Sequence, residues 1–213
     1  MNSIAIKAFC FNPFHENTYV LYNENKDSWI IDPGCFNGEE EAQLKNFILK
    51  EGLRPRKLLL THAHIDHILG CDFVCREWGL APELMRKDLE IYQSGQAIAA
   101  MYGLGYTPCT LPLNFILEGQ EMTLGEVSFT CIWVPGHSPG SICFYAPSEN
   151  LLIAGDVLFE GSIGRTDLPG GNHQELLSNI RTKLFVLPND TIVYPGHGGY
   201  TTIGQERLTN PFF

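Results

Sequence analysis

The hydrophobic and polar positions of the first sixty residues change period several times. The segments "IAIKAF" (residues 4–9) and "NTYVLYN" (17–23) alternate or are rich in β-branched and aromatic residues, which predicts two strands. A third predicted strand, "SWIID" (28–32), is a short apolar run that ends before a Pro-Gly pair. Apolar residues at near-helical spacing, with acidic residues first and a glycine after the end, predict a helix over residues 38–51. The run "KLLL" (57–60) then predicts a buried strand.

The rest of the chain continues this mixture. Helical patterns cover residues 67–78 and 83–102, and the segment "YGLGYTPCTLPLN" (102–114) predicts a loop. Strand patterns return between residues 120 and 155, and a helix (172–187), a strand (191–195) and a short helix (201–210) follow. Strands that are apolar on both faces and interleaved with helices predict an α/β (α+β) fold in which helices cover sheets. No repeat or linker divides the pattern, so we expect one domain over residues 1–213.

Composition narrows the classes of function. Hydrophobic residues make up 44% of the chain, enough for a packed core, and the formal net charge is -10. An acidic surface suits neither nucleic acid nor an anionic membrane, so we expect neither as a partner. The N-terminal segment has one early charge, Lys7, and no apolar run reaches the length of a membrane span. Without an export signal the simplest expected location is the cytoplasm; the oligomeric state is unknown from sequence.

The cysteines predict no cross-link. There are seven, scattered along the chain and never spaced as Cys-x-x-Cys. Cys71 and Cys75 are four residues apart, on one face of a predicted helix. We therefore expect buried free thiols in a reducing compartment rather than a disulfide framework or a thiolate metal site.

Side chains that bind metals crowd one short stretch, "THAHIDHILG" (61–70). Four of six consecutive positions are His62, His64, Asp66 and His67. In an extended or loop backbone, residues two apart lie on one side, so His62 and His64 can face a common point. Asp66 and His67 follow where the chain turns into a helix, so they can face a second, adjacent point. A lone histidine is usually a surface or core residue with its hydrogen bonds satisfied, but four donors this close predict two neighbouring metals.

The remaining ligands are expected at the ends of later strands. His137 in "WVPGHSPGS", Asp156 in "LLIAGDVLF" and His197 in "TIVYPGHGGY" each follow an apolar strand and small residues. Glycines there allow the backbone angles that aim a side chain at a shared point. Each of these residues alone would also suit a turn or a helix cap. Together with the cluster they complete two coordination shells.

These motifs resemble those of the metallo-β-lactamase superfamily. "THAHIDH" is similar to its His-x-His-x-Asp-His signature, and "GHSPGS", "AGDVLF" and "PGHG" are similar to its later ligand motifs, in the same order. The resemblance covers about residues 5 to 200 and implies a four-layer αββα sandwich with a dinuclear site at one edge. It also implies the distribution of the ligands: His62, His64 and His137 on one metal, Asp66, His67 and His197 on the other, with Asp156 bridging.

Two metals of this kind would favour hydrolysis. Metals roughly 3.5 to 4 Å apart can trap a bridging water and lower its pKa to near 7, giving a hydroxide that attacks an acyl or phosphoryl centre. Asp66 would orient this hydroxide as well as bind metal, so no serine or cysteine nucleophile is required. We expect two divalent metals, zinc first, although histidine and aspartate also accept iron or manganese.

Within the superfamily the chain looks most like the short glyoxalase II-like proteins, which are hydroxyacylglutathione hydrolases that cleave glutathione thioesters. The segment "GSIGRTDLPGG" (161–171) resembles their GRTD stretch and that of the related persulfide dioxygenases. Full-length glyoxalase II has a further C-terminal helical domain that supplies much of its glutathione site, and we expect residues 1–213 not to include it. The resemblance implies a small-molecule thioester such as S-lactoylglutathione as substrate.

Two residues are candidates for substrate binding. Arg165 is a planar two-point donor that suits a substrate carboxylate, and the alternative is that it pairs with Asp167. Tyr106 belongs to residues 83–115, the expected cover over the site, and core packing is its alternative role.

Other functions of the same fold stay open. Persulfide dioxygenases bind a single iron through two histidines and one aspartate, although this chain keeps every residue that a second metal would need. Nuclease or phosphodiesterase relatives share the histidine motif, and the acidic charge disfavours them. A β-lactamase is disfavoured by the lack of an export signal, and a non-catalytic metal-binding scaffold by the full ligand set.

Overall fold

The computed structural model describes residues 3–213 and contains two six-stranded sheets. The first sheet has the order β1 (Ala5–Phe11), β2 (Glu16–Tyr22), β3 (Asp27–Ile31), β4 (Arg54–Leu59), β5 (Pro82–Met85), β6 (Asn114–Ile116). The second has the order β14 (Thr201–Thr202), β13 (Ile192–Pro195), β10 (Leu151–Gly155), β9 (Ile142–Ala146), β8 (Val127–Trp133), β7 (Glu121–Leu124). A separate ribbon pairs β11 (Leu158–Phe159) with β12 (Ser162–Ile163).

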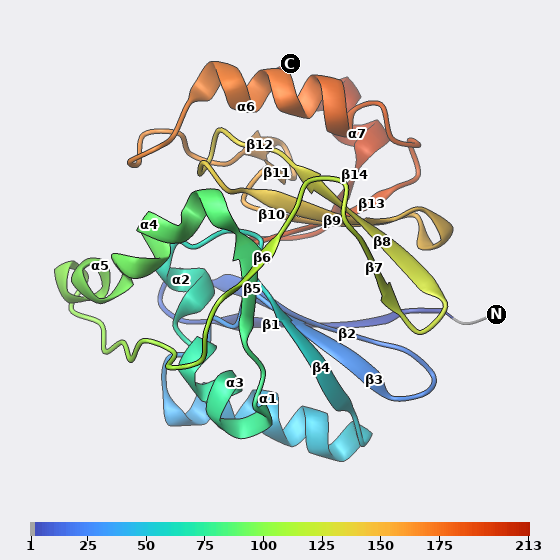
Figure 1. Cartoon of the computed structure of the whole chain (residues 1–213). Coiled ribbons are helices and arrows are strands. Elements are labelled where there is room, and N and C mark those ends of the chain that lie inside the picture. The colour runs from blue at the N-terminus through green and yellow to red at the C-terminus, as the bar shows by residue number, and fades with distance from the viewer. Residues whose placement is uncertain (1–2) are drawn as a thin grey trace.

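Helices cover the outer faces of both sheets (Figure 1). On the side of the first sheet are α1 (Gly38–Glu51), α2 (Ile65–Ile68), α3 (Cys71–Trp78), α4 (Leu89–Gln93) and α5 (Gly95–Met101). On the side of the second are α6 (His173–Asn179), a π-helical turn (Ile180–Leu184) and α7 (Ile203–Thr209). Short 3-10 turns occupy Arg86–Asp88 and Pro147–Glu149.

Three hydrophobic clusters hold these layers together. One lies between the first sheet and its helices, one between the two sheets, and one between the second sheet and its helices. In the middle cluster, the rings of Trp29 on β3 and Phe129 on β8 have centroids 4.9 Å apart. The prediction of a four-layer αββα sandwich is therefore confirmed.

The ends of several strands gather at one edge of the sandwich, between the sheets. β3 and β4 are parallel, and β10 and β13 are parallel, so within each pair the chain leaves the sheet in the same direction. The two sheets meet at Thr61, just after β4, whose carbonyl oxygen accepts a hydrogen bond of 2.8 Å from Ile142 N on β9. Gly155, the last residue of β10, approaches Thr61 so closely that a Cβ there would lie 2.6 Å from the Thr61 Cβ. All the predicted metal ligands follow such strand ends.

One predicted helix is partly wrong. Residues 82–85 form β5, which pairs in parallel with β4 and β6, and only after it do the short helices α4 and α5 begin. The helical spacing of the apolar residues continues through this stretch, so the pattern alone did not separate strand from helix. Pairing with two neighbouring strands overrides a weak local preference.

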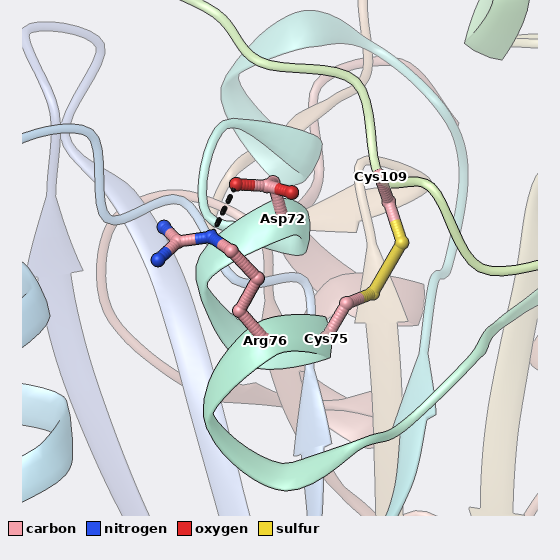
Figure 2. Close-up of a disulfide and its surroundings, with 4 residues drawn as sticks. All are labelled: Asp72, Cys75, Arg76 and Cys109. Carbon is pink, nitrogen blue, oxygen red and sulfur yellow. Dashed lines mark hydrogen bonds and ion pairs between the residues drawn. A yellow bond between two sulfur atoms is a disulfide. The ribbon is translucent and has the colours of Figure 1, made fainter.

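The expectation that the cysteines are all free is also wrong. Cys75 on α3 and Cys109 form a disulfide, with 34 residues of sequence separation (Figure 2). Spacing could not predict it, because the pairing depends on how residues 102–113 fold back onto α3. The other cysteines are free, and of these Cys10 is exposed.

Within residues 3–213, no helix combines the length and apolar character that a membrane span requires.

Candidate metal centre

Three histidines converge at the edge of the sandwich. His62 and His64 lie in the loop between β4 and α2, and His137 lies in the turn after β8. His137 Nε2 is 3.1 Å from His62 Nε2 and 2.8 Å from His64 Nδ1. The ligand nitrogens of the three rings all lie within 4.8 Å of one another. This is the first of the two groups predicted from the sequence.

The environment keeps these rings neutral. Burial lowers the pKa of His62 well below its usual value, and the neighbouring rings of His67 and His137 lower it further. Burial and the adjacent His137 lower the pKa of His64 to about 3. Burial also lowers the pKa of His137, against the opposing effect of Asp156. A neutral imidazole is the form that binds a metal.

A second group lies beside the first and is richer in carboxylates. His197 Nε2 is 3.2 Å from Asp66 Oδ2, and His67 Nε2 is 3.6 Å from the same oxygen. Asp156 lies between the groups: its carboxylate oxygens are 3.4 Å from His67 Nε2, 3.5 Å from His197 Nε2 and 3.6 Å from His137 Nε2. The structure thus brings together all seven residues that the sequence predicted as ligands.

Charge compensation in the second group differs from that in the first. Burial by itself would lower the pKa of His67, but the carboxylates of Asp66 and Asp156 outweigh it and raise that pKa. In the same way, Asp156 and Asp66 raise the pKa of His197 to about 9 against the effect of its burial. The two carboxylates therefore attract positive charge, which is what a cation supplies.

Two buried atoms support the fit of a metal. His67 Nε2 and Asp156 Oδ1 are buried and have no hydrogen-bond partner, although an unsatisfied buried polar atom is costly. Gly196 leaves room beside them: a Cβ there would lie 2.7 Å from His67 Cε1 and closer still to Asp156 Oδ1. Unpaired nitrogen and oxygen donors around a cradle that excludes side chains fit a divalent metal.

The outer nitrogens of the rings fix which nitrogen faces the centre. His137 Nδ1 lies 2.8 Å from the carbonyl oxygen of Arg165, and His197 Nδ1 lies 3.1 Å from that of Phe14. A carbonyl oxygen only accepts, so in both rings Nδ1 carries a proton and Nε2 is the nitrogen that faces the centre. Orientation of this kind by the outer shell is typical of metal-binding histidines.

Asp32 orients a third ring, and the sequence prediction had not included it. It follows β3 directly, is 1% exposed and has a left-handed φ of 49°. Its Oδ2 lies 3.1 Å from His67 Nδ1 and accepts a 2.6 Å hydrogen bond from Thr61 Oγ1, while Oδ1 accepts a 2.7 Å bond from Thr61 N. Its position after the apolar run "SWII" matches that of Asp156 after "LLIAG", so the strand-end pattern could have identified it.

Asp88 is a second buried carboxylate that the sequence prediction had missed. One oxygen accepts hydrogen bonds from Ala63 N (3.0 Å) and Ser138 Oγ (2.8 Å), and the other accepts one from Gly140 N (2.5 Å). It therefore ties the loop of His62 and His64 to the turn of His137. Nothing in "MRKDLEI" distinguishes Asp88 from an ordinary surface residue.

The two predicted substrate residues lie in different surroundings. Arg165 is exposed and forms two hydrogen bonds with Asp167, of 2.7 and 2.8 Å, which is the alternative considered from the sequence. The Tyr106 ring packs near Gly95 and Ile68, and its hydroxyl is buried without a hydrogen-bond partner. A contact between either residue and a substrate stays a prediction.

Comparison with known proteins agrees with this geometry. The family model described as "Metallo-beta-lactamase superfamily" matches residues 11–197. A protein of Haemophilus influenzae named hydroxyacylglutathione hydrolase GloC is 40% identical over 205 residues, which cover 93% of each chain.

Two solved structures are similar over nearly their whole length. The B3 metallo-beta-lactamase BLEG-1 has a TM-score of 0.87 and 39% identity, and the match covers 98% of this chain and 99% of that one. TTHA1623, solved in a di-iron-bound form, has a TM-score of 0.87 and 35% identity, with 97% and 100% coverage. The resemblance seen in the histidine motif is confirmed.

Proposed function

The chain belongs to the metallo-beta-lactamase superfamily and is a metal-dependent hydrolase, and from this premise we propose that it cleaves a thioester in the manner of glyoxalase II. The observation that carries the proposal is the adjacency of the two donor groups, with the Asp156 carboxylate within 3.6 Å of histidine nitrogens from both. The name of the Haemophilus influenzae relative supports the acyl-glutathione class of substrate.

The proposed ligands follow from the two groups. His62, His64 and His137 would hold one divalent metal; Asp66, His67 and His197 would hold the other; and Asp156 would contact both. We propose zinc for both positions, and the di-iron form of TTHA1623 makes iron the alternative. When bound, such a pair lowers the pKa of a water from about 15.7 to near 7 and polarises the acyl carbonyl.

The protein's own groups would orient the reactants. Asp66 Oδ2 faces the rings of His67 and His197, which leaves Oδ1 to accept a hydrogen bond from the attacking water. This hydrogen bond would direct a lone pair of the water at the carbonyl carbon. The thiolate released from a thioester is a good leaving group, so no acidic group of the protein is needed to protonate it. Asp66 is thus proposed as the catalytic residue beside its role as a ligand.

An aromatic pair borders this site. The rings of Phe14 and Tyr102 meet edge to face with centroids 5.2 Å apart, and the Phe14 carbonyl oxygen contacts His197 Nδ1. Tyr102 is 53% exposed, so this pair of rings is accessible to solvent. We propose that it contacts the acyl part of the substrate.

One observation favours a second candidate. The structural relative BLEG-1 carries the name of a B3 metallo-beta-lactamase at 39% identity. Cleavage of a β-lactam amide would use the same donors and the same attacking water. It differs in needing a proton for the leaving nitrogen, which the thiolate released from a thioester does not need.

Metal analysis combined with kinetics would test the proposal. Purified protein would be analysed by mass spectrometry for metals and assayed with S-lactoylglutathione and with a chromogenic β-lactam. About two metals per chain, and thioester cleavage that a chelator abolishes, is the expected result. Faster β-lactam cleavage would favour the second candidate, while one iron per chain and oxygen uptake with glutathione persulfide would indicate a dioxygenase.

Two matched variants would locate the activity. Asp66→Asn removes a carboxylate from the centre, whereas Asp167→Asn makes the same change at an exposed position paired with Arg165. We expect Asp66→Asn to lower kcat by at least about 100-fold and Asp167→Asn to change it less than about threefold. Equal activity of the two variants would contradict the role of Asp66.

A further inference from the structure

The two cysteines of the disulfide differ in exposure. Cys75 lies on the inner face of α3 and is 5% exposed, whereas Cys109 lies in the irregular segment 102–113 and is partly exposed (Figure 2). Thiol–disulfide exchange requires that a thiolate reach a sulfur atom, so access decides which of the two is attacked. Here Cys109 is the more accessible of the two cysteines.

A cavity lies against the accessible sulfur. Its volume is about 410 Å³ and its lining includes Cys109, the amide side chains of Gln93 and Gln96, and the rings of Tyr92 and Tyr106. A second, smaller cavity, which shares Tyr106 with the first, is lined by neither cysteine. The larger cavity is of the size that binds a small organic molecule.

The chemistry of this lining selects a type of ligand. Gln93 and Gln96 are exposed and can both donate and accept hydrogen bonds, as the amides of a short peptide require. The cavity's remaining lining, proline and leucine side chains, is apolar. This combination suits a compact molecule with amide groups and a thiol.

We propose that the cavity binds a small peptide-like thiol, which attacks the Cys109 sulfur and opens the disulfide. A bond forms between the sulfur of the incoming thiol and Cys109 Sγ, and the bond between Cys109 Sγ and Cys75 Sγ breaks. The electron pair leaves with Cys75 Sγ, which takes up the proton that the incoming thiol has lost. The incoming thiol is oxidised to a mixed disulfide and Cys75 is reduced, so no other oxidant is involved.

Opening the disulfide would release segment 102–113 from α3. This segment carries Tyr106, whose ring lies close to Gly95 on α5 and to Ile68 on α2. A Cβ added to Gly95 would lie 3.1 Å from the Tyr106 ring and 3.2 Å from Ile68 Cδ1. Segment 102–113 therefore packs at the junction of α5 with α2, and α2 includes the proposed ligands Asp66 and His67. The modification site is thus connected to the metal centre through packed side chains, although its chemistry needs neither metal nor hydrolysis.

Reaction with glutathione, used as the probe, would test the inference in the full chain. The variant Cys10→Ser serves as background because it removes the exposed free thiol. The protein is incubated with graded glutathione, quenched in acid, alkylated and analysed by peptide mass spectrometry. We expect glutathione on Cys109, an alkylated Cys75, and faster amide hydrogen exchange in residues 102–113.

The concentration dependence separates a binding cavity from simple access. With glutathione the rate of opening should saturate, whereas with 2-mercaptoethanol, which is too small to fill the cavity, it should stay linear. Gln96→Leu, an exposed substitution, should slow the glutathione reaction about fivefold to tenfold by removing one hydrogen bond, and should leave the 2-mercaptoethanol reaction unchanged. Glutathione on Cys75, linear rates with both thiols, or opening only in denaturant would each overturn the proposal.

Discussion

Replacing Asp32 by asparagine would test how the metal centre is oriented. The substitution keeps the size and shape of the side chain, and asparagine tolerates the left-handed backbone that this residue adopts, with a φ of 49°. It removes only the negative charge and one acceptor. Any effect on the site is therefore due to the lost carboxylate and not to a strained backbone.

The hydrogen bonds around Asp32 determine how the asparagine amide must sit. Its NH2 group cannot occupy the place of Oδ1, because the Thr61 backbone N–H donates there at 2.7 Å and cannot turn away. The NH2 group must then face His67 Nδ1, which lies 3.1 Å from Oδ2. Two donors cannot face each other, so the His67 ring would move its proton to Nε2, the nitrogen that faces the metal position. Loss of such an orienting contact weakens a metal site by about 10- to 100-fold, or about 1.4 to 2.7 kcal/mol.

Competition with a chromophoric chelator would measure this loss. We expect the second metal to bind about 10- to 100-fold more weakly in Asp32→Asn, and the affinity for the metal proposed to bind His62, His64 and His137 to change less than about threefold. The matched control is Asp27→Asn, the same change at the partly exposed start of the same strand, where Asp27 pairs with Arg56 at 2.7 Å and with Arg54 at 3.3 Å. Surface pairs contribute about 1 kcal/mol or less, so the control should bind both metals normally. If both variants bind the second metal as the natural chain does, Asp32 does not orient His67.

Four further changes have defined outcomes. Asp156→Asn should reduce the metal content to one per chain or fewer, measured by mass spectrometry, because its carboxylate lies between both donor groups; a retained pair would refute the bridging role. Removing the metals should lower the free energy of unfolding by about 2.7 kcal/mol for each site, relative to protein kept at a free metal concentration of 100 times the Kd of that site. Adding metal back should restore the denaturation midpoint. Gly196→Ala should weaken the second metal, since its Cβ would lie 2.7 Å from His67 Cε1; unchanged chelator competition would count against this close approach. Cys109→Ser should lower the free energy of unfolding by about 4 kcal/mol for a 34-residue separation, and the difference from the natural chain should vanish in a reductant.

Local patterns were sufficient for most of the fold. The alternation in "IAIKAF" and the apolar run "LLIAG" correspond to β1 and β10, because a partly exposed strand alternates apolar and polar residues whereas a fully buried strand is continuously apolar. The pattern failed at residues 82–85, where β5 is four residues long and pairs with β4 and β6. So short a strand carries too few positions for a period to be read, and only its neighbours make it a strand.

The positions of the proposed ligands were predictable for a related reason. A chain that leaves a buried strand must turn at the edge of the sheet, so His137, Asp156 and His197, each following such a strand, were expected to meet there. The stretch 61–70 supplied the other donors within six consecutive residues. The position of a donor relative to the end of a strand thus predicts where the donor lies. Here this was sufficient to predict which residues make up the two donor groups.

The function of a donor within the site depends on contacts that the pattern does not contain. Asp32 and Asp156 both follow apolar strands, but both oxygens of Asp32 already accept hydrogen bonds from Thr61, and one of them also faces His67 Nδ1. Asp156 Oδ1 has no such partner, which leaves it available for a metal. Both oxygens of Asp88 likewise accept hydrogen bonds, from residues 25, 50 and 52 positions away in the sequence. The donors that reach each buried carboxylate thus distinguish Asp32 and Asp88 from Asp156, and those donors come into place only when distant segments fold together.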